Sequence, residues 1–277
     1  MKISLIISTY NAPDFLKLVL RSIAEQIIPS NCNLEVLIAD DGSGFETESL
    51  IAKYQENFRF KLLHIWHADA GFRKAIILNR SVAASSGEYL LFVDGDCILD
   101  KKFVVNHLLL SEIGYFIAGN RILLNERFTQ EIIRNEFDLQ SVSIIKWLFY
   151  AASKKSNNFL HWLRFGLNAR WRKLRQTNWR YPKGCNIGMW KIDYLMINGY
   201  DESFVGWGHE DADLFIRLIH AGIKIKDGRF AAPVYHLWHK VNDRSNEAEN
   251  MARLMARVND STIIRAVEGV DKYNQSL

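Results

Sequence analysis

Apolar and polar positions alternate in blocks along the first hundred residues. Four apolar segments have the composition of parallel strands that are buried on both faces: 3–8, 34–39, 61–66 and 88–93. Pro13 suits the first turn of a helix, and apolar residues recur at helical spacing from there to Ala24. Further helices are expected to end near Tyr54 and Ala84. This order of strands and helices predicts a doubly wound α/β sheet with right-handed crossovers.

The second half of the chain has a less regular pattern. Three of its segments are expected to be strands: 118–124, 223–225 and 232–236. A helix is expected over 212–221 and a polar, helical tail after Asp243, whereas residues 127–180 favour helices and loops. The pattern therefore predicts a more helical second half that completes the sheet.

Polar side chains follow the apolar strands at the points where the strands end. They are Thr9-Tyr10-Asn11 after the first strand, Asp40-Asp41 after the second and Asp94-Gly95-Asp96 after the fourth. Ligands of such sheets bind beyond the carboxyl ends of the strands, so these side chains lie where a ligand is expected.

Asp94-Gly95-Asp96 places two carboxylates on either side of a glycine, directly after a buried strand. Like charges at this spacing are unfavourable unless a cation or a proton lies between them. A hard divalent ion, Mg²⁺ or Mn²⁺, bound together with substrate phosphates would satisfy them. A solvated acidic turn is the common explanation of this tripeptide, but its position at a strand end favours the metal.

A second acidic motif, Glu210-Asp211, follows the aromatic turn Gly206-Trp207-Gly208. Acidic residues stabilise the first turn of many helices, but helix stabilisation does not explain the tryptophan. Carboxylates beside an aromatic ring on an exposed turn favour a functional site instead.

Two histidines and a lysine are further candidates. His236 and His239 follow the last expected strand, and one or both can be metal ligands or packed side chains. Lys74 begins the third helix, where it can approach a phosphate or simply be a solvated helix charge.

Three motifs resemble, in order and spacing, the family 2 glycosyltransferases of the GT-A type: STYN at 8–11, ADDGS at 39–43 and FVDGD at 92–96. GWGHEDAD at 206–213 resembles the GWGxED segment of β-1,4-galactosyltransferases and bacterial chondroitin-type synthases. Residues 125–180 have no counterpart in this resemblance. It implies a GT-A-like mixed α/β sheet with three regions: 1–124 binding a nucleotide sugar, 125–182 as a basic, aromatic, helical insertion, and 183–277 completing the domain with acceptor-binding and catalytic residues.

The resemblance, together with the polar strand ends, assigns expected roles to individual residues. The expected donor-binding residues are Thr9, Tyr10, Asn11, Asp40, Asp41, Lys74, Asp94, Gly95, Asp96 and Trp207. Trp207, Glu210 and Asp211 are expected to bind the acceptor, with Asp211 as the general base. The expected ligands of Mn²⁺ or Mg²⁺ are Asp96, His236 and His239, with the choice between the two histidines open.

The expected function is inverting, metal-dependent transfer of a hexose or N-acetylhexosamine from a nucleotide sugar, by analogy a UDP-sugar. The acceptor is expected to be a glycan or glycolipid of cell-surface polysaccharide or lipopolysaccharide synthesis. Two alternatives stay open. A nucleotidyltransferase would carry a Gly-rich, basic loop where this chain has Thr9-Tyr10-Asn11. A non-catalytic sugar-binding homologue would lack the carboxylates that this chain keeps.

The charge distribution suggests one more partner. The net charge is only +4, but 11 Lys or Arg and no acidic residue lie between Asp138 and Asp193. Within this stretch, Phe159–Tyr181 interleaves Trp and Phe with Arg and Lys. Such a segment suits an anionic membrane surface or a phosphorylated glycolipid, and an amphipathic helix that covers the sheet is the alternative. Without a recognisable nucleic-acid module, nucleic acid is not an expected partner.

Three further observations bear on localisation. No apolar run is long enough to cross a bilayer, and the apolar start of the chain favours a buried strand over a signal peptide. The three cysteines are widely spaced and favour reduced thiols. We therefore expect a cytoplasmic enzyme that can lie peripherally on the cytoplasmic face of the inner membrane.

Overall fold

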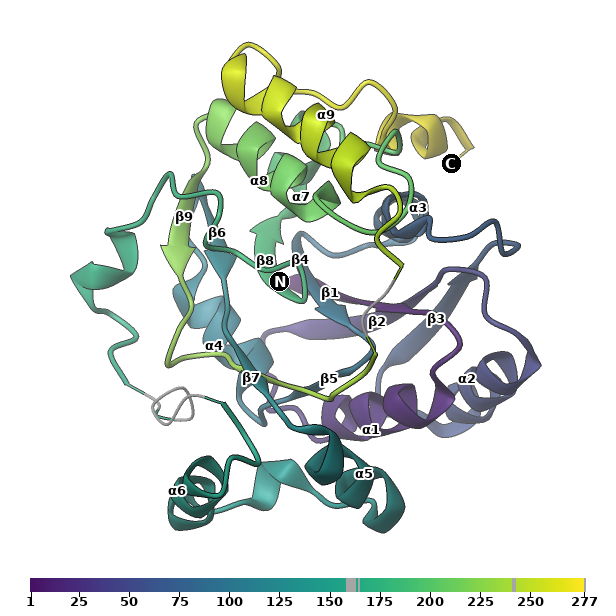
Figure 1. Cartoon of the computed structure of the whole chain (residues 1–277), viewed down its shortest axis with the longest axis vertical. Helices are drawn as coiled ribbons and strands as arrows, with labels where there is room; N and C mark the ends of the chain where they lie inside the picture. Colours follow the sequence, from purple (N-terminus) through teal and green to yellow (C-terminus); the bar gives the residue numbers. More distant parts are fainter. Residues whose placement is uncertain (158–162, 164, 241–242, 277) are drawn as a thin grey trace.

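The computed structural model describes residues 1–157, 163, 165–240 and 243–276, and its first half has the predicted alternation of strands and helices (Figure 1). The elements are β1 (Lys2–Thr9), α1 (Pro13–Ala24), β2 (Asn33–Asp40), α2 (Phe45–Asn57), β3 (Lys61–Trp66), α3 (Lys74–Ala84) and β4 (Tyr89–Asp94). The predicted mixed α/β fold is confirmed.

Within the described part of the chain, seven strands form the large sheet, in the order β3-β2-β1-β4-β8-β6-β9. The first four are parallel; β8 (Asn186–Trp190) runs antiparallel to β4 and to β6 (Tyr115–Ala118), and β6 is parallel to β9 (Lys224–Asp227). Ser8 in β1 pairs with Ala39 in β2 and with Asp94 in β4. The register therefore brings the polar ends of three strands to the same edge of the sheet.

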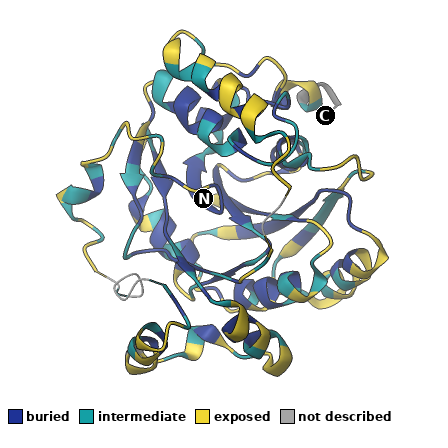
Figure 2. Cartoon of the chain, in the orientation of Figure 1, coloured by how far each residue is buried: buried dark blue, intermediate teal, exposed yellow. Residues whose placement is uncertain are grey.

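The alternation of side chains along each strand divides the core into two layers. In β1, Ile3, Leu5 and Ile7 pack on the side of α1, whereas Ile6 packs on the side of α3. The layer on the α3 side also contains buried residues of α7 (Lys191–Met196) and α8 (Glu210–His220). Figures 1 and 2 show the buried sheet between these two helical layers, with α9 (Glu247–Asn259) outermost over α8. The helices thus hold the strand ends in a fixed arrangement.

A second, three-stranded sheet lies beside the polar strand ends. Its order is β5 (Cys97–Leu99), β10 (Val234–His236) and β7 (Arg121–Leu123). The prediction of one strand over 118–124 was wrong, because β6 ends at Ala118 and β7 belongs to the small sheet. The buried Asn186 side chain causes the break: it donates to the carbonyl of Asn120 at 3.0 Å and occupies the space of a side chain at Gly119.

The region between the two halves contains α4 (Phe103–Leu110) before β6, then α5 (Glu126–Asn135), η1 (Leu139–Ser141), α6 (Ile144–Ala152) and η2 (Arg170–Lys173). A final helix, η3 (Val270–Ser276), packs on α3. Among the helices of the described residues, none combines the length and apolar character needed to cross a bilayer.

The basic, aromatic segment forms turns and η2 over 165–181, not a continuous amphipathic helix. Its residues 159–162 and 164 lie outside the described part of the chain. The segment covers the edge strand β9, where the N–H of Ile225 donates to the carbonyl of Gln176 at 2.9 Å. Arg172 is 1% exposed and donates to four main-chain carbonyls, those of Phe165, Gly166, Asp227 and Arg229. At least one cation of the basic, aromatic segment therefore stabilises the fold.

Candidate active site

The end of β1 places three predicted donor-binding residues in different surroundings. Thr9 is buried, and its hydroxyl has no hydrogen-bond partner among the described residues. Tyr10 is 49% exposed and donates to Asp69 at 2.8 Å. Asn11 connects this loop to the neighbouring one, because its side-chain oxygen accepts from the N–H of Gly44 at 2.9 Å. The unpartnered hydroxyl of Thr9 is a feature that a bound ligand can satisfy.

The two carboxylates at the end of β2 have separate partners. Asp40 is fully buried and accepts from the N–H of Ser43 at 2.8 Å and from His64 Nε2 at 2.9 Å. Burial alone would raise its pKa, but these hydrogen bonds lower the pKa of Asp40 below its usual range. Each oxygen of Asp40 thus has a partner within the protein, and these contacts hold the end of β2. The contact of Asp40 with the donor stays a prediction.

Asp41 faces the outer part of the same loop. Its oxygens lie 2.7 Å from His67 Nε2 and 2.9 Å from the N–H of Arg73. Burial raises the pKa of Asp41, although both of these contacts oppose that change. Sequence reasoning missed His64 and His67. Their position, one in the second half of the apolar strand β3 and one just after it, was the signal that could have found them, since β3 pairs with β2.

Asp96, His236 and His239 form the one group among the described residues that is suited to hold a metal ion. One ligand atom of each residue lies within 4.8 Å of the others. Pairing of β10 with β5 sets His236 opposite Cys97, the neighbour of Asp96. The ring of His239 contacts Asp96 at 3.0 Å, and this hydrogen bond raises the pKa of His239 to about 9. Two imidazoles and one carboxylate fit a first-row transition ion such as Mn²⁺ better than Mg²⁺, which prefers oxygen ligands.

The second cluster surrounds Lys74. Its ammonium lies 2.8 Å from Asp94, which also accepts from the hydroxyl of Ser8 at 2.8 Å. Burial opposes a charge on the lysine, but Asp211, Asp94 and Glu210 raise the pKa of Lys74 well above its usual value. Lys74 of α3 is therefore a permanent cation among three carboxylates, one from β4 and two from α8.

Glu210 and Asp211 begin α8, two residues earlier than predicted. Glu210 is buried and accepts from the N–H of Gly208 at 3.1 Å. Burial, assisted by the charge of Asp211, raises the pKa of Glu210 to about 7. Asp211 is half-buried and accepts from the hydroxyl of Tyr200 at 2.9 Å. The two adjacent carboxylates thus have different environments, a common basis for different roles.

Gly95 and Trp207 border these clusters. A side chain at Gly95 would approach the carbonyl of Ser8 to 2.9 Å, so only glycine leaves the backbone open at this strand end. Trp207 is half-buried, and the guanidinium of Arg244 lies 4.6 Å from its ring centroid. A sugar would therefore meet the opposite ring face of Trp207 or displace Arg244.

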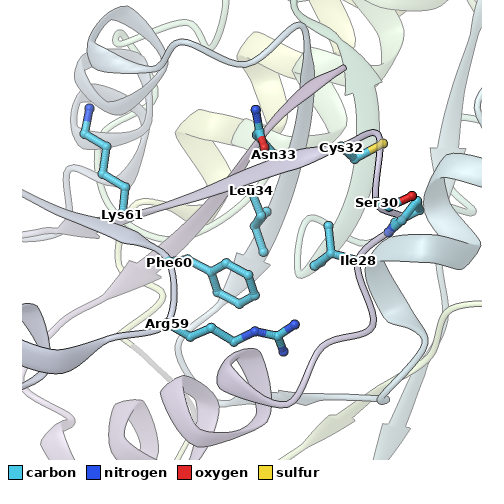
Figure 3. A pocket seen from close by; sticks show the side chains of 9 residues that line it. Ile28, Ser30, Cys32, Asn33, Leu34, Arg59, Phe60 and Lys61 are labelled. Atoms are coloured by element: carbon cyan, nitrogen blue, oxygen red, sulfur yellow. The ribbon is translucent and has the colours of Figure 1, made fainter.

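A hollow of about 370 Å³ lies elsewhere, at the amino ends of β2 and β3 (Figure 3). Its wall includes Cys32, Arg59, Phe60 and Lys61. Arg59 is already engaged, because it donates to the carbonyls of Ala24 and Gln26. This hollow is at the edge of the sheet opposite to the polar strand ends, so it is not part of the candidate site.

Comparison with known families bears on this arrangement. The profile described as glycosyl transferase family 2 matches residues 4–188, which include all three polar strand ends. The chain belongs to glycosyl transferase family 2. A second profile, described as the N-terminal domain of galactosyltransferase, matches residues 170–240 of this glycosyltransferase. Family membership makes the chain a glycosyltransferase and decides against the nucleotidyltransferase alternative.

Curated relatives resemble this glycosyltransferase over most of its length. It is 24% identical to validoxylamine A glucosyltransferase of Streptomyces hygroscopicus subsp. limoneus, over 91% of this chain and 54% of that protein. It is 23% identical to chondroitin synthase of Escherichia coli, over 90% of this chain and 36% of that protein. The chain therefore spans only about a third to a half of the length of these relatives.

Solved structures share the fold. S. aureus TarS 1-349 in complex with UDP superposes with a TM-score of 0.63 and 15% identity, covering 99% of this chain and 70% of that one. The mannosyltransferase PcManGT from Pyrobaculum calidifontis, in complex with GDP-Man and Mn²⁺, gives a TM-score of 0.59 with 14% identity over 95% of this chain and 67% of that one. At these identities the likeness establishes the fold alone.

Proposed function

We propose that this glycosyltransferase moves a hexose or N-acetylhexosamine from a nucleotide sugar to a glycan or glycolipid, with inversion at the anomeric carbon. The observation that carries the proposal is the pair of adjoining clusters at one edge of the sheet. One combines Lys74 with Asp94, Glu210 and Asp211; the other is the group of possible metal ligands. Together they offer a proton acceptor for one substrate and charge neutralisation for the other.

The donor end of the site lies between the ends of β1, β2 and β4. The unpartnered hydroxyl of Thr9, the exposed Tyr10 and the carboxylate of Asp41 are available to a nucleoside there. A UDP-sugar is the expected donor, since UDP is bound to the structurally similar TarS. GDP-Man in PcManGT makes guanosine sugars the natural second choice.

Mn²⁺ or Mg²⁺ held by Asp96 with His236, His239 or both would supply positive charge to the departing diphosphate. Lys74 adds a fixed cation beside Asp94, where it can interact with the same phosphates. Mn²⁺ is the expected ion, because two of the three candidate ligands are imidazoles.

Asp211 is the proposed base. Its carboxylate takes the proton of the acceptor hydroxyl while that oxygen forms a bond to the anomeric carbon. The bond from that carbon to the diphosphate oxygen breaks on the opposite face, and its electron pair leaves with the diphosphate. Glu210, whose side chain lies beside Asp211, is proposed to bind acceptor hydroxyls, and Trp207 to pack against the sugars.

The acceptor is proposed to belong to cell-surface polysaccharide or lipopolysaccharide synthesis. Chondroitin synthase is a relative named for a polymer that it makes, and the poly(ribitol-phosphate) β-N-acetylglucosaminyltransferase TarS is a relative named for a polymer. We propose a cytoplasmic enzyme in peripheral contact with the inner membrane through the basic, aromatic segment 159–181. Within its described part, Phe165 and Leu174 are 50% and 81% exposed, close in sequence to the exposed Arg170, Arg175 and Arg180.

The test begins with a panel of UDP- and GDP-sugars in the presence of Mn²⁺. Binding is found from the rise in melting temperature, and turnover from release of the nucleotide. Asp211→Asn is expected to bind the best donor normally but to lower turnover by about 10²–10⁴-fold, the usual contribution of a general base. Glu249→Gln, an exposed carboxylate on α9, is the control and should retain full turnover. Unchanged turnover in Asp211→Asn would remove Asp211 as the base.

A further inference from the structure

Tyr200 lies behind the proposed base on the side away from solvent. Its ring is 1% exposed, and its hydroxyl donates to Asp211 Oδ1 at 2.9 Å. Burial and the neighbouring Asp211 charge raise the pKa of Tyr200 well above its usual value, so the hydroxyl keeps its proton. It therefore acts as a hydrogen-bond donor to the carboxylate and not as an acid or base in its own right.

A single buried amide holds the backbone of Tyr200 from both sides. The oxygen of Asn79 accepts from the N–H of Tyr200 at 3.0 Å, and its nitrogen donates to the carbonyl of Tyr200 at 2.9 Å. Asn79 is itself fixed, because the hydroxyl of Tyr194 donates to it at 2.6 Å and Glu202 accepts from it at 2.9 Å. Phe92 packs edge-on against the ring of Tyr200. The position of the hydroxyl is thus determined by the core.

The backbone of Gly184 also packs against the carboxylate. A side chain at Gly184 would collide with both oxygens of Asp211, so residue 184 must be glycine for the loop before β8 to approach this closely. With Tyr200 bound to Oδ1 and the Gly184 backbone against the whole group, Asp211 has little freedom to rotate. This matters because a base must meet its proton within hydrogen-bond distance and in the right direction.

We propose that Tyr200 is a positioning residue for the reaction: its hydroxyl holds the Asp211 carboxylate in the orientation that faces the acceptor. The inference rests on the proposed role of Asp211. The charged or titratable groups around this carboxylate are Lys74 of α3, Asp94 of β4, Glu210 of α8 and Tyr200 itself.

The test is Tyr200→Phe, which keeps the ring and removes only the hydroxyl. Release of the nucleotide from the best donor of the panel is measured with Mn²⁺ as a function of pH. The expected result is a kcat lower by about tenfold, a donor KM unchanged within about twofold, and an acid limb of the kcat/KM profile about one pH unit higher. Tyr89→Phe is the control: it removes a buried tyrosine hydroxyl from the other core layer, on the side of α1, and should leave the acid limb in place.

Two outcomes overturn the inference. One is a wild-type kcat and pH profile in Tyr200→Phe. The other is an equal displacement of the acid limb in Tyr89→Phe, which would mean that the loss of any buried tyrosine hydroxyl moves the limb. If Tyr200→Phe does not fold, 3-fluorotyrosine is placed at position 200. Its more acidic hydroxyl is expected to move the acid limb to lower pH, and no movement overturns the inference.

Asp211→Asn, measured in the same experiment, separates this inference from the proposed function. If the Asp211→Asn variant is active, Asp211 is not the base, and the proposed role of Tyr200 is contradicted as well. An inactive Asp211→Asn variant beside a Tyr200→Phe variant of wild-type behaviour leaves the proposed function in place and removes only the role of Tyr200.

Discussion

At the scale of single residues, the buried carboxyl group of Glu210 lowers the stability of the folded protein. Its side chain is buried beside Asp211, and these surroundings raise its pKa from 4.5 to about 7. Lys74, which is positioned to neutralise the cluster, forms its closest contact with Asp94 instead. A carboxylic acid whose ionisation is unfavourable in the folded state destabilises the protein at neutral pH. Such destabilising groups are common in sites that bind substrate.

Replacing Glu210 by Gln is therefore expected to stabilise the protein in a pH-dependent manner. Below pH 4.5 the side chain of Glu210 is protonated in both the folded and the unfolded state. Its titration therefore adds no difference between the free energies of unfolding of wild type and variant there. As pH rises through about 7, the unfolded wild type loses this proton more readily than the folded one, and wild-type stability falls relative to the variant. The difference in the free energy of unfolding should reach a plateau on the order of 3 kcal/mol.

Urea denaturation in EDTA at several pH values between about 4 and 8 measures this difference. Glu249→Gln on α9 should show no such trend. A stability difference that is constant over the range, or that shrinks toward neutral pH, would contradict the assigned environment of Glu210.

At the scale of elements, the segment over β9 shows how one side chain fixes a stretch of irregular backbone. Residues 165–181 contain only the short η2 helix, so their backbone carbonyls depend on other partners. Arg172 provides donors for two carbonyls of the segment, for that of Asp227 at the end of β9 and for that of Arg229 just beyond it. The arginine thereby connects the segment to the edge of the sheet and covers an edge strand that would otherwise be open.

Arg172→Met keeps the aliphatic part of the side chain and removes all four donors. The free energy of unfolding should fall by about 3 kcal/mol or more, because buried carbonyls lose charged partners. Amide hydrogen exchange should accelerate in β9 and over 165–181, with little change in β1 and β2. Arg170→Met, at an exposed position of the same turn, is the control. Equal exchange in both variants would show that Arg172 does not hold the segment.

At the scale of the whole molecule, charge and exposed apolar side chains are unevenly distributed. The span between Asp138 and Asp193 carries 11 cations and no acidic residue. Nearby acidic groups are already paired: Glu112 binds Lys173 and Lys226, and Asp227 binds Arg229. The exposed cations of this span are therefore left to attract an anionic surface.

Flotation with vesicles tests this proposal. The protein should float with vesicles that contain phosphatidylglycerol, much less with pure phosphatidylcholine, and less at high salt. Leu174→Asp should weaken flotation, whereas Val267→Asp should not; both side chains are 81% exposed in the wild type, and Val267 lies outside the basic span. Flotation that does not depend on anionic lipid, or that both variants weaken equally, contradicts membrane contact through this segment.

The sequence by itself determined the α/β half of the molecule and the chemistry at its strand ends. A continuous apolar segment followed by polar residues indicates a buried strand with an exposed end. The pattern of apolar and polar residues along the chain predicts such local burial directly. Asp94, Asp96, Glu210 and Asp211 stood out for the same reason, since a short run of residues defines each motif. The error at 118–124 has its cause elsewhere in the chain: Asn186 interrupts the strand from a distance in sequence, with no local sign.

Only the tertiary structure decided which residues meet. His236 and His239 approach Asp96 because β10 lies between β5 and β7 in the small sheet, and β5 begins directly after Asp96. Lys74 meets Glu210 and Asp211 because α3 and α8 pack on the same face of the large sheet. The contact of Tyr200 with Asp211 depends in turn on Asn79 in α3. These contacts between residues distant in sequence follow from strand order and helix packing. Both are properties of the whole chain, and no local sequence pattern predicts them.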